Sequence, residues 1–189
     1  MNDHVCARCA VCGPACCIVP PEREHLCFPL TSADIARIAP HAPAIPWHVS
    51  EPNNPGLLHT LTSLFAEDAA YIRAMFPPHG EHQRLATDER GRCLLLSDSG
   101  CVLPVAARPL HCLLYPFWMR GQSIMLMDTD CLALDEARGT AMLMRSLGMT
   151  PAMVRELYAD LRASLGLAAW PVATPPRAPE AMNAANRGV

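Results

Sequence analysis

The chain has no lysine, few aromatic residues and little charge. All fifteen basic residues are arginine, aromatic residues make up 5% of the 189 positions, and charged residues make up 17%. The net charge of -3 provides no basic field, which argues against non-specific binding to nucleic acid. Hydrophobic residues reach 51%, so the composition is that of a globular protein and not of a disordered chain.

Long apolar runs are also missing. No stretch contains the roughly 18 uninterrupted apolar residues of a membrane span, and the first residues lack the charged-then-apolar pattern of a secretory signal. We therefore expect a cytoplasmic protein with no membrane partner. In a reducing compartment the ten cysteines are better explained as metal ligands than as disulfides, although export to an oxidising compartment keeps disulfides open as an alternative.

Cysteine is the residue that the chain has in abundance. Five of the ten lie in one short segment, at Cys6, Cys9, Cys12, Cys16 and Cys17. A Cys-x-x-Cys turn directs both of its sulfur atoms into one concavity, and Gly13 and Pro14 are turn residues that can direct further ligands toward the same point. We interpret residues 6–17, called here the N-terminal cysteine segment, as part of a metal site to which later cysteines contribute.

The spacing leaves the metal open between zinc and iron. Four thiolates saturate a tetrahedral zinc ion, so eight cysteines would fill two zinc sites or one larger cluster. The run from Cys6 to Cys16 also has the spacing of a bacterial ferredoxin, except that Cys17 replaces the proline after the last cysteine. Zinc and iron, including an iron–sulfur cluster, are both compatible with these residues.

The remaining pattern predicts an α+β fold that is mostly α, an irregular small domain with a short β-hairpin, stapled by the multi-cysteine metal site. A capping box at residues 31–34 predicts a helix over 32–39, and apolar spacing predicts helices over 57–76, 135–147 and 150–165. The proline-rich residues 41–56 are expected to form an extended surface connector. We expect one domain over 1–170 and a disordered tail over 171–189.

The strands are expected near the later cysteines. Two apolar runs around a glycine-containing turn predict a hairpin over 92–103, with Cys93 and Cys101 near the start of facing strands. A helical turn opening at Pro109 should carry His111 and Cys112, and a short strand over 123–127 precedes Cys131.

Several single residues carry alternative interpretations. His111 is a possible ligand or a hydrogen-bonded histidine, and Cys27 fits best as a small buried hydrophobe. The neighbouring carboxylates of Glu67 and Asp68 are expected on a solvated helix face rather than in a catalytic pair.

The order of these motifs resembles that of the YkgJ-type cysteine-cluster proteins, a bacterial family described as zinc- or iron-chelating domains. The matching elements are Cys9-x-x-Cys12 with Cys16-Cys17, Leu30-Thr31-x-x-Asp34-Ile35, Gly91-x-Cys93-x-x-Leu96, Cys101, Arg108-Pro109-x-x-Cys112-x-x-Tyr115-Pro116-Phe117 and Cys131. The chain departs from the family at Pro104-Val105, where a tyrosine is common, and at Leu113, where an arginine is common.

The resemblance implies that the eight motif cysteines chelate zinc or an iron centre. These are Cys9, Cys12, Cys16, Cys17, Cys93, Cys101, Cys112 and Cys131. Because thiolates bring negative charge, Arg8 and Arg108 are candidates to offset it. No phosphate-binding loop, zinc-protease motif or nucleophile elbow is present, so a non-enzymatic metal-binding protein is favoured. Two alternatives stay open: an iron–sulfur-dependent redox or methyl-transfer enzyme or accessory factor, by analogy with flagellin lysine methylases, and a module that binds a protein partner.

Overall fold

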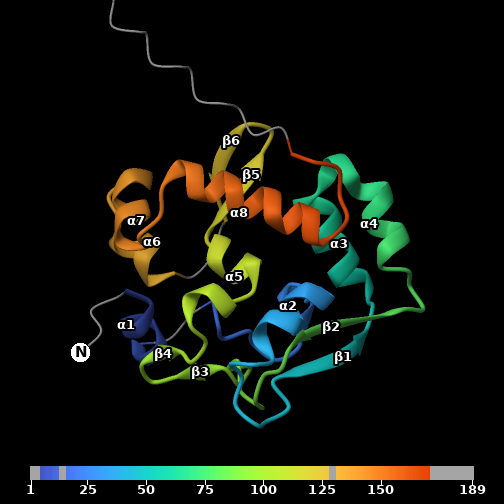
Figure 1. Ribbon diagram of the computed structural model, residues 1–189, viewed down its shortest axis with the longest axis horizontal. Coiled ribbons are helices and arrows are strands. Elements are labelled where there is room, and N and C mark those ends of the chain that lie inside the picture. The colour runs from blue at the N-terminus through green and yellow to red at the C-terminus, as the bar shows by residue number, and fades with distance from the viewer. Residues whose placement is uncertain (1–4, 13–15, 128–130, 171–189) are drawn as a thin grey trace, which may run out of the picture.

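The structure is a computed structural model, and it describes residues 5–12, 16–127 and 131–170. Short helices predominate and the strands form short antiparallel pairs, which confirms the α+β class (Figure 1). The α-helices are α1 Val5–Cys12, α2 Ser32–Ile38, α3 Pro55–Leu64, α4 Ala69–Met75, α5 Leu110–Leu114, α6 Leu132–Glu136, α7 Thr140–Ser146 and α8 Pro151–Ser164. The strands are β1 His48–Pro52, β2 Glu81–Leu85, β3 Leu96–Ser97, β4 Gly100–Cys101, β5 Phe117–Arg120 and β6 Ser123–Leu126. Three single turns of 3-10 helix complete the described elements: η1 Glu24–Leu26, η2 Ala66–Asp68 and η3 Val105–Ala107.

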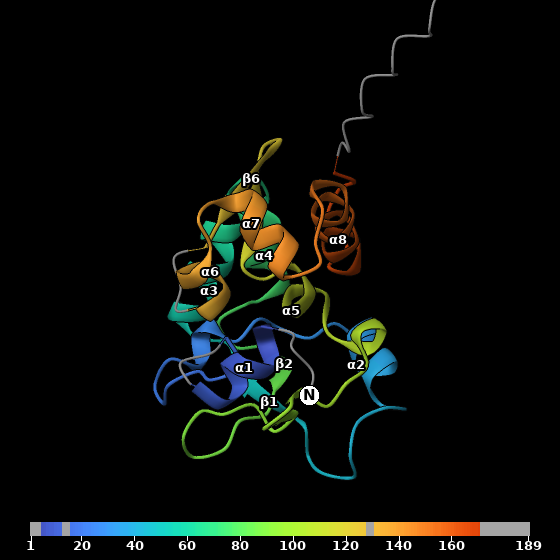
Figure 2. The ribbon, with the colours of Figure 1, turned by 90° about the vertical axis from the view of Figure 1, so that its left-hand side faces the viewer.

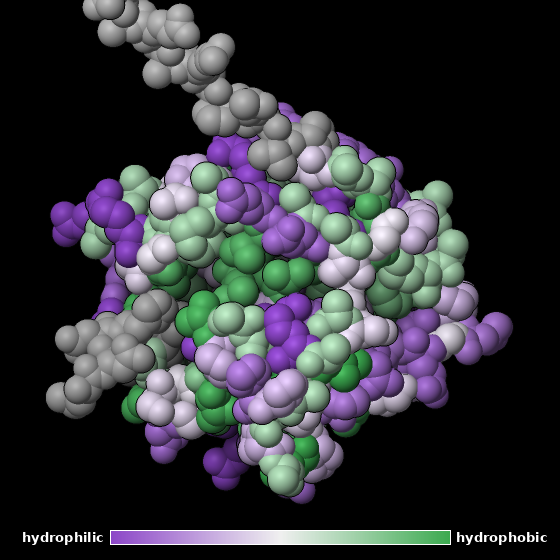
Figure 3. All heavy atoms as spheres, in the orientation of Figure 1, coloured by the Kyte–Doolittle hydropathy of each residue, from purple (hydrophilic) through white to green (hydrophobic). Residues whose placement is uncertain are grey.

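The elements fall into two groups with α5 between them. In Figures 1 and 2, α1, α2 and the strands β1 to β4 lie at one end, and α3, α4, α6, α7, α8 and the β5–β6 hairpin lie at the other. Each end has its own cluster of buried residues. The larger cluster is centred on Phe65, Phe117 and Tyr158, and the smaller one on Ile38 and Leu95. On the face shown in Figure 3, strongly apolar residues gather near the centre.

The helix predicted over 32–39 is confirmed together with its cap. The hydroxyl of Thr31 accepts a hydrogen bond from the backbone N–H of Asp34 at 3.1 Å, and the carboxylate of Asp34 accepts one from the N–H of Thr31 at 3.0 Å. Arg37 then pairs with the buried Asp34 at 2.6 Å. A buried carboxylate without a partner would destabilise the fold, so the ion pair with Arg37 stabilises Asp34 in its capping position.

The prediction of one long helix over 57–76 is wrong. The chain forms α3, leaves helical geometry at Phe65, makes the η2 turn and begins again as α4. Phe65 and Ile72 are both buried, and the residues between them include no buried hydrophobic side chain. Breaking the helix lets both flanking segments turn their apolar stripes toward the core, which a single straight helix could not do.

The carboxylates on this segment also differ from expectation. Glu67 is exposed, as predicted, but Asp68 accepts a hydrogen bond at 2.6 Å from Arg162, which lies on α8 and is only 4% exposed. Asp68 is therefore an internal ion-pair partner and not part of a solvated face. The pair joins η2 to α8 across the larger core.

Two further boundaries need correction. Residues 41–56 include β1, which pairs in antiparallel register with β2 from His48↔Leu85 to Pro52↔Glu81, so this part is a sheet edge and not only a surface connector. The helix predicted over 135–147 is two short helices, α6 and α7, separated by Gly139 at φ +105°. The helix predicted over 150–165 is confirmed as α8, with the Thr150 hydroxyl accepting from the N–H of Met153.

The hairpin predicted over 92–103 is present but shorter. Only β3 and β4 form the ladder, with Leu96 opposite Cys101, while Cys93 lies before β3 in an isolated bridge with Thr87. The strand predicted over 123–127 is confirmed as β6, and its partner is β5. Among the described residues, no helix combines the length and the apolar character needed to cross a membrane.

Candidate metal centre

Cysteines that are far apart in the sequence converge on one small cavity. This cavity, called here the cysteine cavity, has a volume of about 100 Å³. Seven of the eight motif cysteines line it: Cys9, Cys16, Cys17, Cys93, Cys101, Cys112 and Cys131. The side chain of the eighth, Cys12, lies outside the described residues, as do the turn residues Gly13 and Pro14. The seven come from α1, the segment after it, the β3–β4 region, α5 and the start of α6.

The backbone after the N-terminal cysteine segment is held against the segment that carries Cys93. The N–H of Cys93 donates to the carbonyl of Cys17 at 2.8 Å, and the N–H of Val19 donates to the carbonyl of Gly91 at 2.8 Å. These two bonds flank an antiparallel bridge. They bring the first and second groups of cysteines together without the help of any side chain.

Gly91 makes this close approach possible. Its φ of +77° lies in the left-handed region, and a Cβ at this position would stand 1.7 Å from the carbonyl oxygen of Val19. No side chain fits there, so the Gly-x-Cys motif has a steric reason in this fold. The glycine allows Cys93 and Cys17 to lie on adjacent segments.

The last two cysteines come from two further helices. Cys112 is carried by α5, and Cys131 is the residue that precedes the first turn of α6. The Arg108 to Phe117 run also supplies Pro109, Tyr115 and Pro116 to the lining. The apolar part of the wall comes from both cores: Leu95 and Leu103 belong to the smaller cluster, and Val5 and Ala133 to the larger. The cavity thus lies at the junction of the two clusters.

Burial favours the neutral form of the Cys93 and Cys112 thiols. It raises the pKa of Cys93 to about 12 and raises the pKa of Cys112 well above its usual value. In both cases neighbouring cysteines add to the increase, because thiolates close to one another repel. A bound cation would reverse this balance, since metal coordination selects the thiolate.

The side chains of Cys16 and Cys17 bring their sulfur atoms close together. Their sulfur atoms are 3.9 Å apart, and this contact, followed by burial, raises the pKa of Cys17. Two ligands on one tetrahedral zinc ion stand about 3.8 Å apart, given Zn–S bonds of about 2.3 Å. The spacing of these two sulfur atoms therefore suits one shared ion.

Arginine side chains lie beside the thiols, although the two candidates differ. Arg108 lines the cavity, donates from Nε to the carbonyl of Leu103 at 3.2 Å and partly offsets the increase in the pKa of Cys17 and Cys101. Arg8 instead forms an exposed two-pronged ion pair with Glu136 at 2.7 and 2.8 Å. Arg92, which the motifs did not single out, also offsets part of the increase in the pKa of Cys17. Its place directly before Cys93 was the available signal.

His111 is half-buried next to the site and is not part of the cavity lining. Its Nε2 lies 3.3 Å from the sulfur of Cys112, its ring stacks on Phe28 at 4.9 Å, and its Nδ1 is buried with no hydrogen-bond partner among the described residues. Burial lowers the pKa of His111 to about 4, so the imidazole is neutral at physiological pH. It can therefore donate to Cys112 only through an Nε2–H tautomer.

The sulfur atoms surround a common space without closing on one point. Within the described ranges, no three histidine, cysteine or acidic side chains form a ready-made metal-binding group. None of the eight cysteines with described side chains is in a disulfide. Cys27 is half-buried outside the cavity lining, and burial raises its pKa to about 11.

Comparison with known proteins adds no relative. Neither the models of protein families, nor the curated proteins, nor the solved structures contain a match to this chain.

Proposed function

We propose that the chain is a metal-binding protein whose cysteine cavity holds zinc or an iron centre. The observation that carries the proposal is the convergence of seven motif cysteines, drawn from positions 9 to 131, on a single cavity of about 100 Å³. Chance burial of hydrophobic thiols would distribute them over both cores. Here, among the eight cysteines with described side chains, only Cys27 is absent from the lining.

The donor set fits a soft metal. Sulfur ligands select zinc, copper(I) and iron–sulfur centres over magnesium or calcium, and no carboxylate is among the lining residues. Seven thiols exceed the four that saturate one tetrahedral zinc ion, so the set favours two ions or one polynuclear cluster. Arg108 offsets part of the negative charge that such a centre would bring.

The proposal follows the resemblance to the YkgJ-type proteins and does not depend on it alone. Gly91, Cys93, Arg108 and Cys112 belong to the motifs that carry the resemblance, and each has a distinct structural role around the same cavity. A metal bound there would link the two buried clusters and stabilise the fold by the free energy of its binding.

The test is metal analysis of the full chain purified without oxygen. We expect either about two zinc ions per chain and no colour, or iron with acid-labile sulfide and absorption in the visible range. An iron result would favour a redox role, and a zinc result a structural one. A folded chain that contains neither metal and takes up neither would contradict the proposal.

Matched serine variants locate the site. Cys112 and the more exposed Cys16 both line the cavity, so Cys112→Ser and Cys16→Ser should each lower the metal content. Cys27 is a half-buried thiol outside the lining, so Cys27→Ser should leave the metal content unchanged. Circular dichroism of each variant separates loss of ligands from loss of fold. Equal metal content in all three variants would show that the cysteine cavity is not the binding site.

A further inference from the structure

Hydrogen-bond donors lie beside several of the sulfur atoms that line the cysteine cavity. The sulfur of Cys93 accepts a hydrogen bond from the backbone N–H of Leu95. The sulfur of Cys101 accepts one in the same way from the backbone N–H of Leu103, and another from the side chain of Arg108. A neutral thiol is a weak acceptor and a thiolate is a strong one. Donors in these positions therefore suit sulfur atoms that bind a metal as thiolates.

Cys112 has a donor of a different kind, the imidazole ring of the preceding residue. Nε2 of His111 lies 3.3 Å from the sulfur of Cys112. Cys112 lines the cavity and His111 does not, so the ring reaches the sulfur from outside the lining. In a metal site, a side chain that bonds to a ligand in this way fixes the direction of the ligand and tunes its affinity.

The surroundings of the ring determine which nitrogen atom carries the proton. Nδ1 of His111 is buried and has no hydrogen-bond partner among the described residues. If Cys112 donated its S–H to Nε2, the proton of the neutral ring would be on Nδ1, as a buried N–H without an acceptor. If Nε2–H donates to the sulfur instead, only a lone pair is left unsatisfied. Buried N–H groups without a partner are rarer than buried acceptors without one, so the Nε2–H arrangement is favoured.

A charged group lies near this pair but does not supply the missing acceptor. The carboxylate of Asp34, a residue only 1% exposed, acts electrostatically on both His111 and Cys112. Its oxygen atoms already accept hydrogen bonds from the hydroxyl of Thr31 at 2.8 Å and from Arg37 at 2.6 Å. A proton on Nδ1 would gain no partner from Asp34, which again favours the proton on Nε2.

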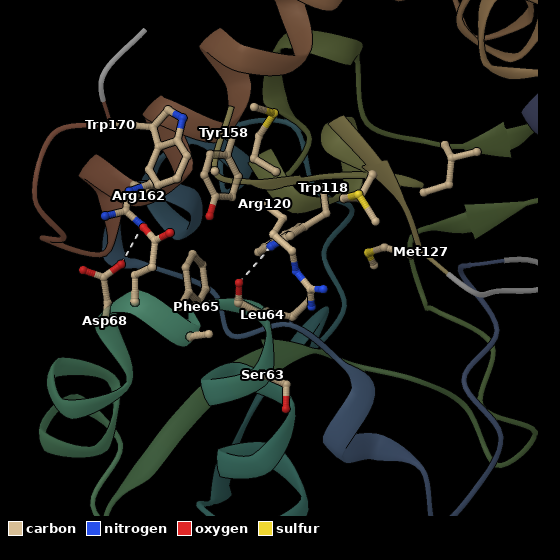
Figure 4. Close-up of a pocket in the computed structure, with 16 residues that line it drawn as sticks. Ser63, Leu64, Phe65, Asp68, Trp118, Arg120, Met127, Tyr158, Arg162 and Trp170 are labelled. Carbon is tan, nitrogen blue, oxygen red and sulfur yellow. Dashed lines mark hydrogen bonds and ion pairs between the residues drawn. The ribbon is translucent and has the colours of Figure 1, made fainter. Parts of the chain in front are cut away.

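Packing holds the ring in this orientation. His111 stacks on Phe28, with 4.9 Å between the ring centroids and 27° between the ring planes. Phe28 in turn contacts Phe65 and Trp118, each at 6.2 Å between centroids. Figure 4 shows these last two rings in the aromatic part of the larger core. The imidazole is therefore fixed by the larger core, while Cys112 faces the cavity.

We propose that His111 is a positioning residue of the metal centre: its Nε2–H donates to the sulfur of Cys112 and directs that sulfur, as a thiolate, toward the bound ion. This inference rests on the proposed function. A thiolate has no proton to donate, so the Nε2–H arrangement is the one that remains when a metal ion replaces the proton of Cys112. The hydrogen bond is then charge-assisted and stronger, which raises the affinity of the cavity for the ion.

The first measurement is long-range proton–nitrogen NMR of the full chain labelled with ¹⁵N in histidine, before and after addition of Zn²⁺. The signals of His111 are those that disappear in His111→Phe. We expect a proton on Nε2 and none on Nδ1 in both samples. A proton on Nδ1 would overturn the proposal, whether or not the chain binds zinc.

Two replacements of His111 separate the hydrogen bond from the packing. His111→Gln keeps an N–H donor close to the position of Nε2 but loses the aromatic stack, whereas His111→Phe keeps the stack on Phe28 and loses the donor. Titration of the full chain with Co²⁺ in the absence of oxygen gives the affinity, and the sulfur-to-cobalt charge-transfer band reports the electron density on sulfur. We expect His111→Phe to bind Co²⁺ about tenfold more weakly and to shift the band to longer wavelength. His111→Gln should recover most of both changes.

His59→Phe is the matched control, because His59 is exposed on α3 and lies outside the cavity lining, so this variant should behave as the original chain does. Weaker binding in His111→Gln than in His111→Phe would show that the ring acts only by packing on Phe28, and would overturn the proposal. Equal affinity in all three variants would overturn it as well. A chain that takes up no Co²⁺ would refute the proposed function and the positioning role with it. A chain that takes up Co²⁺ with an unshifted band in His111→Phe would refute the positioning role alone.

Discussion

Replacing Gly91 by alanine tests whether backbone contact assembles the cysteine cavity. The new Cβ would lie 1.7 Å from the carbonyl oxygen of Val19, far inside van der Waals contact, so one of the two segments must move away. That movement breaks the hydrogen bonds from Val19 to Gly91 and from Cys93 to Cys17, both 2.8 Å long. Each bond is worth about 1 kcal/mol, and the left-handed conformation at φ +77° adds about 1 kcal/mol more.

We therefore expect Gly91→Ala to lower the free energy of unfolding by about 3 kcal/mol and the melting temperature by about 6 to 12 °C. Metal content should fall with it, because Cys17 and Cys93 would no longer lie on adjacent segments. Urea denaturation followed by circular dichroism measures the first quantity, and elemental analysis of the purified variant measures the second.

Gly148→Ala is the matched control. Gly148 also has a positive φ, +66°, but nothing lies within 4 Å of a Cβ added there. Its replacement should lower the free energy of unfolding by only about 1 kcal/mol, the cost of placing a Cβ in the left-handed conformation, and should leave the metal content unchanged. If Gly91→Ala proved no more costly than Gly148→Ala, steric contact between residues 19 and 91 would not be what positions the cysteines.

Other predictions concern stability at sites away from the cysteines. Thr31→Ala removes one half of the capping box and should lower the free energy of unfolding, measured with urea, by about 1 kcal/mol. Thr62→Ala is the control and should lower it by less, because the Thr62 hydroxyl bonds only within its own helix. Asp68→Asn leaves the buried Arg162 without its counter-charge and should cost about 3 kcal/mol; a loss under 1 kcal/mol would mean that the pair is solvated. Burial lowers the pKa of His82, so the unfolded state binds the proton more tightly, and stability should fall as the pH drops below about 6.5. His82→Phe should reduce this loss of stability at low pH. If the free energy of unfolding of the variant depends on pH as that of the original chain does, His82 is not the group responsible.

Local signals in the sequence predicted the elements that carry their own caps. The helix α2 has Thr31 and Asp34, and α8 has Thr150 followed by Pro151. In each case the residues that stop or start the helix act within one turn of it, so the tertiary structure is not needed to locate it. The same holds for the turn between β3 and β4, where Gly100 has φ +102°.

Elements that depend on distant partners were not visible in the local pattern. The strand β1 lies among prolines, and its partner β2 comes after two intervening helices and reads Glu-His-Gln-Arg-Leu, with little apolar alternation. What pairs them is backbone hydrogen bonding together with cross-strand contacts such as Ser50 to Glu81 and Arg84 to Glu51. The break at Phe65 is of the same kind, because Asp68 is positioned by Arg162 from the far end of the chain.

The candidate site was predictable in its membership but not in its arrangement. Spacing and motif order selected eight cysteines, of which the seven with described side chains line one cavity. The proximity of the Cys16 and Cys17 sulfurs and the ion pair of Arg8 with Glu136 depend on tertiary packing.

Because of the position of α5, a metal ion in the cysteine cavity would affect the folding of the chain and not only the cysteines that hold it. Over five residues, this helix supplies Leu114 to the larger core and Cys112 to the cysteine cavity, and it packs against α8. A helix of this length is too short to be stable by itself, so its geometry depends on what it packs against at both ends. A metal ion held by Cys112 would supply one of those anchors, and the larger core supplies the other. Ligation and folding would therefore be one event here, because the residue that would bind the ion and the residue that fills the core lie within a single turn of the same helix.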